Sequence, residues 1–571
     1  MGRIVNQLQR IYEVWIASQV DLGGRYSLSR LRDFNAYSKR TSMLRVAAMC
    51  LLTPLPCLVL MTLMDCIPLA PPDAGTDANY IYWFRNSLVT LLISYTALEQ
   101  FRTTVLGLPI RFSHVHTIAF VSSLGAIAFE YMLSRVIGFP LPFTLAEGVF
   151  VWGAIIVAMF LCFFGRTIRA NEQVQNDLGN SVGVLYGQIS MSLAYPAFIY
   201  GFNSIDPAAQ KYYVVLLPIL KILFKNWISR FMGEYDDKKP ENIIINVEFF
   251  NAFYVACCMQ RTSSISTTLV LLLIDWMQMM SSLVELNAIN VQSKRLMRAI
   301  PEGHKWYGKT SIEVALCIIE EDERIRTHPS LRESCLHSGQ AAFRRRSLKS
   351  QEPKIPNSQR NAVRIVPVVS ALSPRGQGTG TAVDAPTCAD ITIEQGRQLT
   401  ELAQARVGEQ HDTLKQRSKP TLDLLTDENE RLKFVQRVTE LLFTIEFVVL
   451  IEYVEVIVPI IYSTYIVGVY HLENRAYYAQ IAALDGDELK RTILNVMIYA
   501  GLEFMSFTAV TITIYRRMGV ATLKQLSFVL ERQWTVVHTK LLTWFFFAVQ
   551  NSLDHFGYDF SFQFAWLNKK T

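Results

Sequence analysis

Three glutamates lie inside one strongly apolar segment, FTIEFVVLIEYVEVIVPIIY, at residues 443–462. Ionisable residues are costly inside a bilayer, and they usually face a bundle interior or a water-filled cavity, where they bind ions or relay protons. Glu452 and Glu455 are three residues apart and therefore share one face of a helix. Glu446 lies six residues before Glu452 and points elsewhere, but it remains a candidate. The pattern predicts a binding site for a cation or a proton.

Pro459 adds a free acceptor beside this pair. Proline has no N–H, so the carbonyl of Glu455, four residues earlier, loses its helical hydrogen-bond partner, and a kink is expected. Two carboxyls and one free carbonyl on the same short arc form an oxygen-rich site. Such a site suits hard cations, or protons passed between carboxyls.

Further ionisable residues are expected at a similar depth. Glu503 and Asp275 each lie midway through another apolar run and are candidates to complete the site, while Glu130 lies deep in a third run. Lys221, in LLPILKILF, is the one clearly central base and the expected counter-charge. Because acids outnumber bases, some carboxyls must be protonated, bound to a cation or exposed to a water-filled cavity. The alternative is structural: protonated carboxyls can join helices, and a lysine–acid pair can serve packing alone.

The composition places these residues in a membrane protein. Of the 571 residues, 51% are hydrophobic and only 18% are charged, whereas soluble domains carry about 25% charged residues. Apolar runs of about 20 residues, the length that crosses a bilayer, recur along the chain. The predicted fold is therefore all-α, a polytopic helix bundle integral to the plasma membrane or an endomembrane.

Ten candidate spans follow from the apolar runs. They lie at residues 44–64, 81–98, 116–137, 145–165, 181–202, 212–231, 243–260, 264–286, 441–465 and 492–515. The seventh is short and interrupted by polar residues, so nine spans is an alternative. VVHTKLLTWFFFAV, at 536–549, is apolar but short and contains Lys540, which favours an interfacial or re-entrant helix over an eleventh span. Arginine and lysine cluster before the first span and after even-numbered ones, which predicts that both termini are cytoplasmic.

The chain divides into five predicted parts. These are a cytoplasmic region with an amphipathic helix (1–43), a bundle of about eight helices (44–286), a largely disordered cytoplasmic insert (287–430), two further membrane helices (431–515) and a cytoplasmic or interfacial segment (516–571). Ser347 follows the basic run Arg344–Arg346 and is a candidate phosphorylation site, the alternative being an unmodified solvated tail.

Catalytic and cofactor motifs are absent or fail their structural context. GHKWYGKT, at 303–310, matches the P-loop pattern, but it follows a poor strand candidate and carries bulky side chains where the loop should wrap phosphate. No metal-binding cluster, hydrolase elbow or nucleic-acid-binding pattern stands out, so we expect no enzyme activity, metal or cofactor. Gly183 and Gly187 form a G-x-x-x-G pattern that lets helices pack closely, either within the chain or, alternatively, in a homo-oligomer.

Several segments together resemble a known family. They are TSMLRVAAMCLLTPLPCLVLMTLMDCIPLAPP (41–72), IGFPLPF (137–143), FVLERQW (528–534), HFGYDF (555–560) and the IEYVEVIVPIIY run. They resemble a large family of uncharacterised multi-pass membrane proteins of oomycetes, and the likeness covers most of the chain except the insert. The resemblance implies a membrane protein with this order of spans, and it supplies no functional residues.

These observations predict a cation or proton-coupled transporter or channel whose partners are the lipid bilayer and a small ion or solute. The alternative is a non-transporting scaffold or receptor that recruits partners through its insert. Acids that converge on one cavity favour transport, whereas acids that face separate neighbours favour a structural role.

Overall fold

The structure is a computed structural model that describes residues 24–105, 107–232, 239–261, 265–298, 300–328, 331, 427–550 and 552–568. Within these ranges every regular element is a helix, and the only β-type contact is an isolated bridge between Tyr478 and Leu553. The all-α prediction is thus confirmed. The predicted N-terminal amphipathic helix, Ser347 and most of the predicted insert lie outside the described residues.

Seven helices in the described ranges are long and apolar enough to cross a membrane, which identifies a membrane protein. They are Met43–Asp65, which joins α3 (Met43–Leu52) to α4 (Leu55–Asp65), α6 (Phe112–Ile137), α7 (Thr144–Ala170), α8 (Glu172–Ser204), Pro240–Gln260, Thr267–Arg298 within α13 (Ile265–Arg298), and α20 (Gly486–Met518). The remaining predicted spans correspond to helices that are not among these seven, namely α5 (Tyr80–Thr104), α9 (Pro207–Tyr213) with α10 (Leu216–Phe231), and α19 (Glu428–Tyr470).

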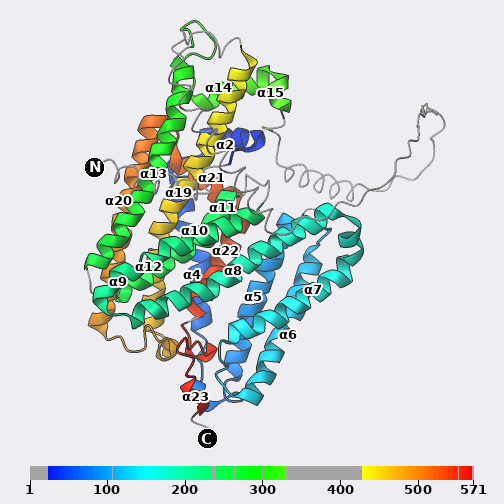
Figure 1. The fold of residues 1–571 in the computed structure, drawn as a ribbon, viewed down its shortest axis with the longest axis vertical. Coiled ribbons are helices and arrows are strands. Elements are labelled where there is room, and N and C mark those ends of the chain that lie inside the picture. The colour runs from blue at the N-terminus through cyan, green and yellow to red at the C-terminus, as the bar shows by residue number, and fades with distance from the viewer. Residues whose placement is uncertain are drawn as a thin grey trace, which may run out of the picture. The chain divides into compact units, whose positions relative to one another are not determined.

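The longest described helix, α19, lies beside α13 and α20 (Figure 1). It has 43 residues, and all ten from Leu441 to Leu450 are buried. It packs against α12 (Phe249–Arg261), α13 and α20. Pro459, where the sequence predicts a kink, lies inside this helix, which continues beyond it to Tyr470.

The seventh predicted span is buried more completely than any of the other six apolar helices. It consists of α11 (Lys239–Ile243), a π-helical turn η4 (Ile244–Glu248) and α12, and its apolar window is 100% buried. The polar residues that make this segment look weak as a span therefore face other helices rather than lipid. Single π-helical turns are frequent at functional sites.

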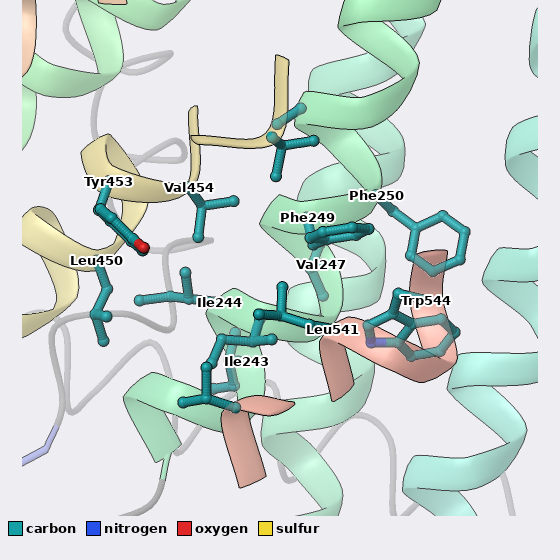
Figure 2. Close-up of a cluster of buried hydrophobic side chains, with 14 of the residues drawn as sticks. Ile243, Ile244, Val247, Phe249, Phe250, Leu450, Tyr453, Val454, Leu541 and Trp544 are labelled. Carbon is teal, nitrogen blue, oxygen red and sulfur yellow. The ribbon is translucent and has the colours of Figure 1, made fainter. Parts of the chain in front are cut away.

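Helix α22 (Trp534–Gln550) is also part of the core. It packs against α4, α5 and η4. Figure 2 shows Leu541 and Trp544 of α22 beside Phe249 and Phe250, and the rings of Phe250 and Trp544 meet edge to face with centroids 4.6 Å apart. The segment that the sequence predicts to be interfacial thus lies among other helices.

The N-terminal end of the described chain contacts α19, and its C-terminal end contacts the loops after α19 and α6. Tyr26, just before α2 (Leu28–Arg40), donates its backbone N–H to the carbonyl of Thr439 at 3.2 Å. Beyond the other end of α19, Ala479 donates to the carbonyl of Ser552 at 3.3 Å, and Phe143 donates to the carbonyl of Gly557 at 3.1 Å. Thr439 and the end of α19 at Tyr470 are roughly 45 Å apart along the helix.

Candidate functional site

Four buried carboxyls, one half-buried carboxyl (Asp275) and two buried lysines gather where five helical elements meet, and we call this group the core cluster. It comprises Lys221 and Lys225 of α10, Glu248 of η4, Asp275 of α13, Glu452 and Glu455 of α19, and Glu503 of α20. Four of the predicted acids and the predicted counter-charge thus lie together. Five helical elements contribute, so the group is assembled by the tertiary fold.

Both lysines bind Glu248. The Lys221 Nζ lies 2.8 Å from one carboxyl oxygen of Glu248, and the Lys225 Nζ lies 2.6 Å from the other. Lys221 also lies 3.5 Å from Glu455 and donates to the side-chain oxygen of Gln278 at 3.0 Å. The π-helical turn therefore places one carboxylate between two ammonium groups.

The other acids of the core cluster have mostly neutral partners. Glu452 accepts a hydrogen bond from Ser506 at 2.9 Å, and Asp275 accepts one from Tyr499 at 3.4 Å. Glu503 lies one helical turn after Tyr499 and interacts electrostatically with Glu452 and Asp275. Its Oε1 atom is buried without a hydrogen-bond partner in the described part of the chain.

A small cavity lies inside the core cluster. Its space open to the centre of a water molecule is about 30 Å³, and every member of the core cluster except Glu503 lines it. One water needs about 10–15 Å³ by this measure, so the cavity has room for about two waters. Carboxyls from different helices therefore line one space that is large enough for water.

The formal charge of the core cluster is strongly negative. Five ionised carboxyls and two ammonium groups sum to −3. An uncompensated charge of this size is not tolerated in a low-dielectric interior, so bound protons or cations must neutralise part of it. Among the described residues, no group of three or more His, Cys, Asp or Glu has an arrangement that could hold a metal ion.

Glu446 belongs to a different group, which we call the inner cluster: Tyr26, Arg30, Glu241 and Glu446. Arg30 Nη2 lies 2.6 Å from a carboxyl oxygen of Glu446 and 2.6 Å from one of Glu241. The Tyr26 hydroxyl donates to Glu446 and accepts from Gln525 at 2.8 Å. Residues just before and within α2 thus reach the interior, which the sequence did not predict.

A third buried group, the outer cluster, lies at the other end of α19 and consists of Asp65, Arg85, Tyr465 and Tyr478. Arg85 lies 2.5 Å from an oxygen of Asp65 and donates to Tyr478 at 2.9 Å. Both tyrosines donate to Asp65. Asp65 lies one residue beyond the first predicted span, 44–64. One feature of the sequence could have indicated this cluster: Arg85 lies inside an apolar run, directly after three aromatic residues (82–84), and a buried arginine needs an acidic partner.

The remaining sequence candidates have structural surroundings. Gly183 and Gly187 pack against α10 of the same chain, where an added Cβ would lie 2.4 Å from the Phe231 ring and 2.7 Å from Trp227. This supports the internal-packing interpretation, while self-association through these glycines stays a prediction. Thr310 of the P-loop-like segment caps α14 (Ser311–Glu321) and accepts from Glu313 N–H at 3.3 Å, and the segment before it forms turns.

No family model matches the chain, and neither the curated proteins nor the solved structures include a match. The resemblance to the oomycete membrane proteins therefore depends on the quoted segments alone.

Proposed function

We propose that the protein is a transporter or channel that moves protons or a small cation through the core cluster. One observation carries this proposal: carboxyls from α13, α19 and η4 line one cavity in a group whose formal charge is −3. A carboxyl with a purely structural role needs only a hydrogen bond or an ion pair with one neighbouring group. A group of carboxyls that share one cavity and carry excess negative charge instead provides a place where a cation or proton can bind and leave.

The spacing of the three clusters along α19 supports a gated path. Glu446 of the inner cluster lies six residues before Glu452, roughly 9 Å along the helix, and Tyr465 of the outer cluster lies ten residues after Glu455, roughly 15 Å. Each outlying cluster is buried and closed by an arginine. We infer that the inner and outer clusters close the two ends of the path and that opening one of them exposes the core cluster to water.

The fold also supports a proposed topology of eleven crossings. To the ten predicted spans it adds α22, whose 17 residues extend roughly 26 Å, close to the thickness of the hydrocarbon core. The basic ends of α5, α7, α13 and α20 then lie on the cytoplasmic side with α2. Residues 552–568 contact the loops after α4, α6 and α19, so this topology places them on the opposite side. It therefore differs from the prediction of two cytoplasmic termini.

The test is a flux assay on protein reconstituted into liposomes. We expect the wild type to move protons, or one of sodium and potassium, and the variant Glu452→Gln with Glu455→Gln to lose at least about 90% of that flux. Glu430→Gln is the matched control, because Glu430 lies on the same helix outside the core cluster, paired with Lys433 at 3.0 Å. A folded wild type that moves none of these ions, or a double variant with full flux, would refute the proposal.

A further inference from the structure

A second cavity lies outside the core cluster, between α5, α6, α7, α8 and α22. Its space open to the centre of a water molecule is about 60 Å³, twice that of the core cluster. Its walls are largely apolar and include Ile93, Val149, Leu185 and Phe547. A mostly apolar cavity with a few polar groups is the usual form of a site for a small organic ligand.

Lys540 gives this cavity a cationic end. Its side chain is only 5% exposed, and its Nζ donates to the side-chain oxygen of Gln100 at 2.7 Å. Within the described ranges no carboxylate lies within ion-pair distance of Lys540. A buried ammonium held by a neutral amide alone is costly, because the amide does not compensate its charge. An anionic group of a bound ligand would supply the missing counter-charge.

The surroundings of Lys540 are built rather than incidental. Gln188 donates to Gln100 at 3.3 Å and to Asn246 at 2.9 Å, and the Trp544 Nε1 donates to the same Asn246 oxygen at 2.9 Å. Side chains from α5, α8, η4 and α22 thus fix the amide that holds the ammonium. Such a network restrains Lys540 and leaves two of its three donor hydrogens for other acceptors.

The cavity is elongated, and its other end is acidic. The α5 residues that line it run from Thr90 to Gln100, roughly 15 Å along the helix. Glu130 lines it too and accepts from Asn86, which precedes Thr90 by one turn, at 2.9 Å. An added Cβ at Gly148 would lie 1.9 Å from the Glu130 carboxyl, so only glycine lets that carboxyl lie against α7. The Lys540 end therefore attracts an anionic group, whereas the Glu130 carboxyl, held against α7 and Asn86, closes the other end.

A smaller cavity continues past Lys540. It shares Gln100, Thr539 and Lys540 with the first and extends to Thr103 and Thr104 at the C-terminal end of α5. Glu99 also lines it, but its carboxylate is paired with Arg102 and lies beyond ion-pair distance of Lys540. The ammonium thus lies between a long apolar space and a short polar space that leads to the end of the helix. The polar space, the ammonium and the apolar space follow one another in this order. A single-chain amphiphile has the same order, with its polar head group first and its apolar chain after it.

We propose that this cavity binds a medium-chain carboxylate, with its carboxylate on Lys540 and its apolar chain between α5, α7 and α22. The ligand class follows from three features: one uncompensated ammonium, largely apolar walls, and a length limited by the Glu130 end. The site is separate from the core cluster and does not depend on the transport proposal.

The test uses brominated decanoate as the probe and full-length protein in nanodiscs of zwitterionic lipid. Bromine quenches nearby tryptophans, and Trp152 and Trp544 both line the cavity. We expect saturable quenching whose amplitude falls in Trp152→Phe. Lys540→Met should weaken decanoate binding at least about tenfold, because it removes a charge-assisted contact. The exposed Lys490→Met should leave affinity unchanged, and the matching brominated alcohol should bind the wild type at least about tenfold more weakly.

Equal affinity in Lys540→Met and wild type, or equal affinity for the carboxylate and the alcohol, would overturn the proposal. So would quenching that rises linearly without saturation, which reports partition into lipid only. If Lys540→Met fails to fold, the comparison of carboxylate with alcohol in the wild type and the loss of amplitude in Trp152→Phe still decide the question.

Discussion

Replacing Lys221 by methionine tests the charge balance of the core cluster. Lys221 is buried and contacts Glu248 at 2.8 Å, Glu455 at 3.5 Å and Gln278 at 3.0 Å. The substitution removes these contacts and changes the formal charge from −3 to −4. Breaking a buried ion pair by removing one partner costs about 3–5 kcal/mol. Lys225 still binds Glu248 at 2.6 Å, so we expect the lower end of this range, about 3 kcal/mol.

The same reasoning predicts a partial rescue. Lys221→Met combined with Glu455→Gln restores a formal charge of −3, so the double variant should recover at least about 1 kcal/mol of the loss as a coupling energy. Reversible chemical unfolding in detergent micelles, followed by tryptophan fluorescence, measures both. Lys490→Met controls for the loss of an exposed lysine. A single variant as stable as wild type, or a double variant that shows no coupling, would refute this account of the cluster.

Three further predictions concern packing, the outer cluster and the C-terminal segment. Gly187→Ala should destabilise the fold by about 1–3 kcal/mol, because its Cβ would lie 2.7 Å from Trp227. Gly179→Ala on the same helix is the control, because its Cβ would meet nothing within 4 Å and stability should not change. Thermal unfolding of the two variants measures the difference. Arg85→Met should cost about 3–5 kcal/mol, because it leaves Asp65 buried without its cation. Arg135→Met, at the exposed pair with Asp77, should change stability little, and equal denaturant midpoints for the two variants would contradict this prediction. Burial lowers the pKa of His555 to about 4, so the unfolded chain binds a proton first and stability should fall by about 2 kcal/mol between about pH 7 and pH 5. Burial also raises the pKa of neighbouring Asp554 to about 6, which offsets part of this loss, so the measurement compares the pH dependence of unfolding in wild type and His555→Gln.

The sequence predicts helices that expose an apolar face to lipid, and it predicts sites whose residues are close together in the sequence. Apolar length locates the helices, and the three-residue spacing places Glu452 and Glu455 on one face. Asp275, Glu503 and Lys221 were predicted from depth alone, and the structure brings them to the same place.

Glu248 was not predicted because it lies in a segment that other helices enclose, whose apolar window is 100% buried. Hydropathy measures compatibility with lipid, so a helix enclosed by other helices can carry polar residues and still be buried. This is why the segment with Glu248 looked like the weakest span although it is wholly buried, and why α22 looked interfacial. The Asp65–Tyr465 and Arg30–Glu446 contacts join residues 400 or more positions apart, which no local pattern reveals.

The most direct test of the central claim asks whether three helices contribute to one transport site. Proton or cation flux into liposomes would be measured for Asp275→Asn of α13, Glu452→Gln of α19, Glu503→Gln of α20 and their pairwise combinations. Residues that act as a unit have strongly non-additive effects. The account predicts that each single variant removes most of the flux and that each double variant is little worse. Additive small losses, or flux in every variant equal to wild type, would contradict it.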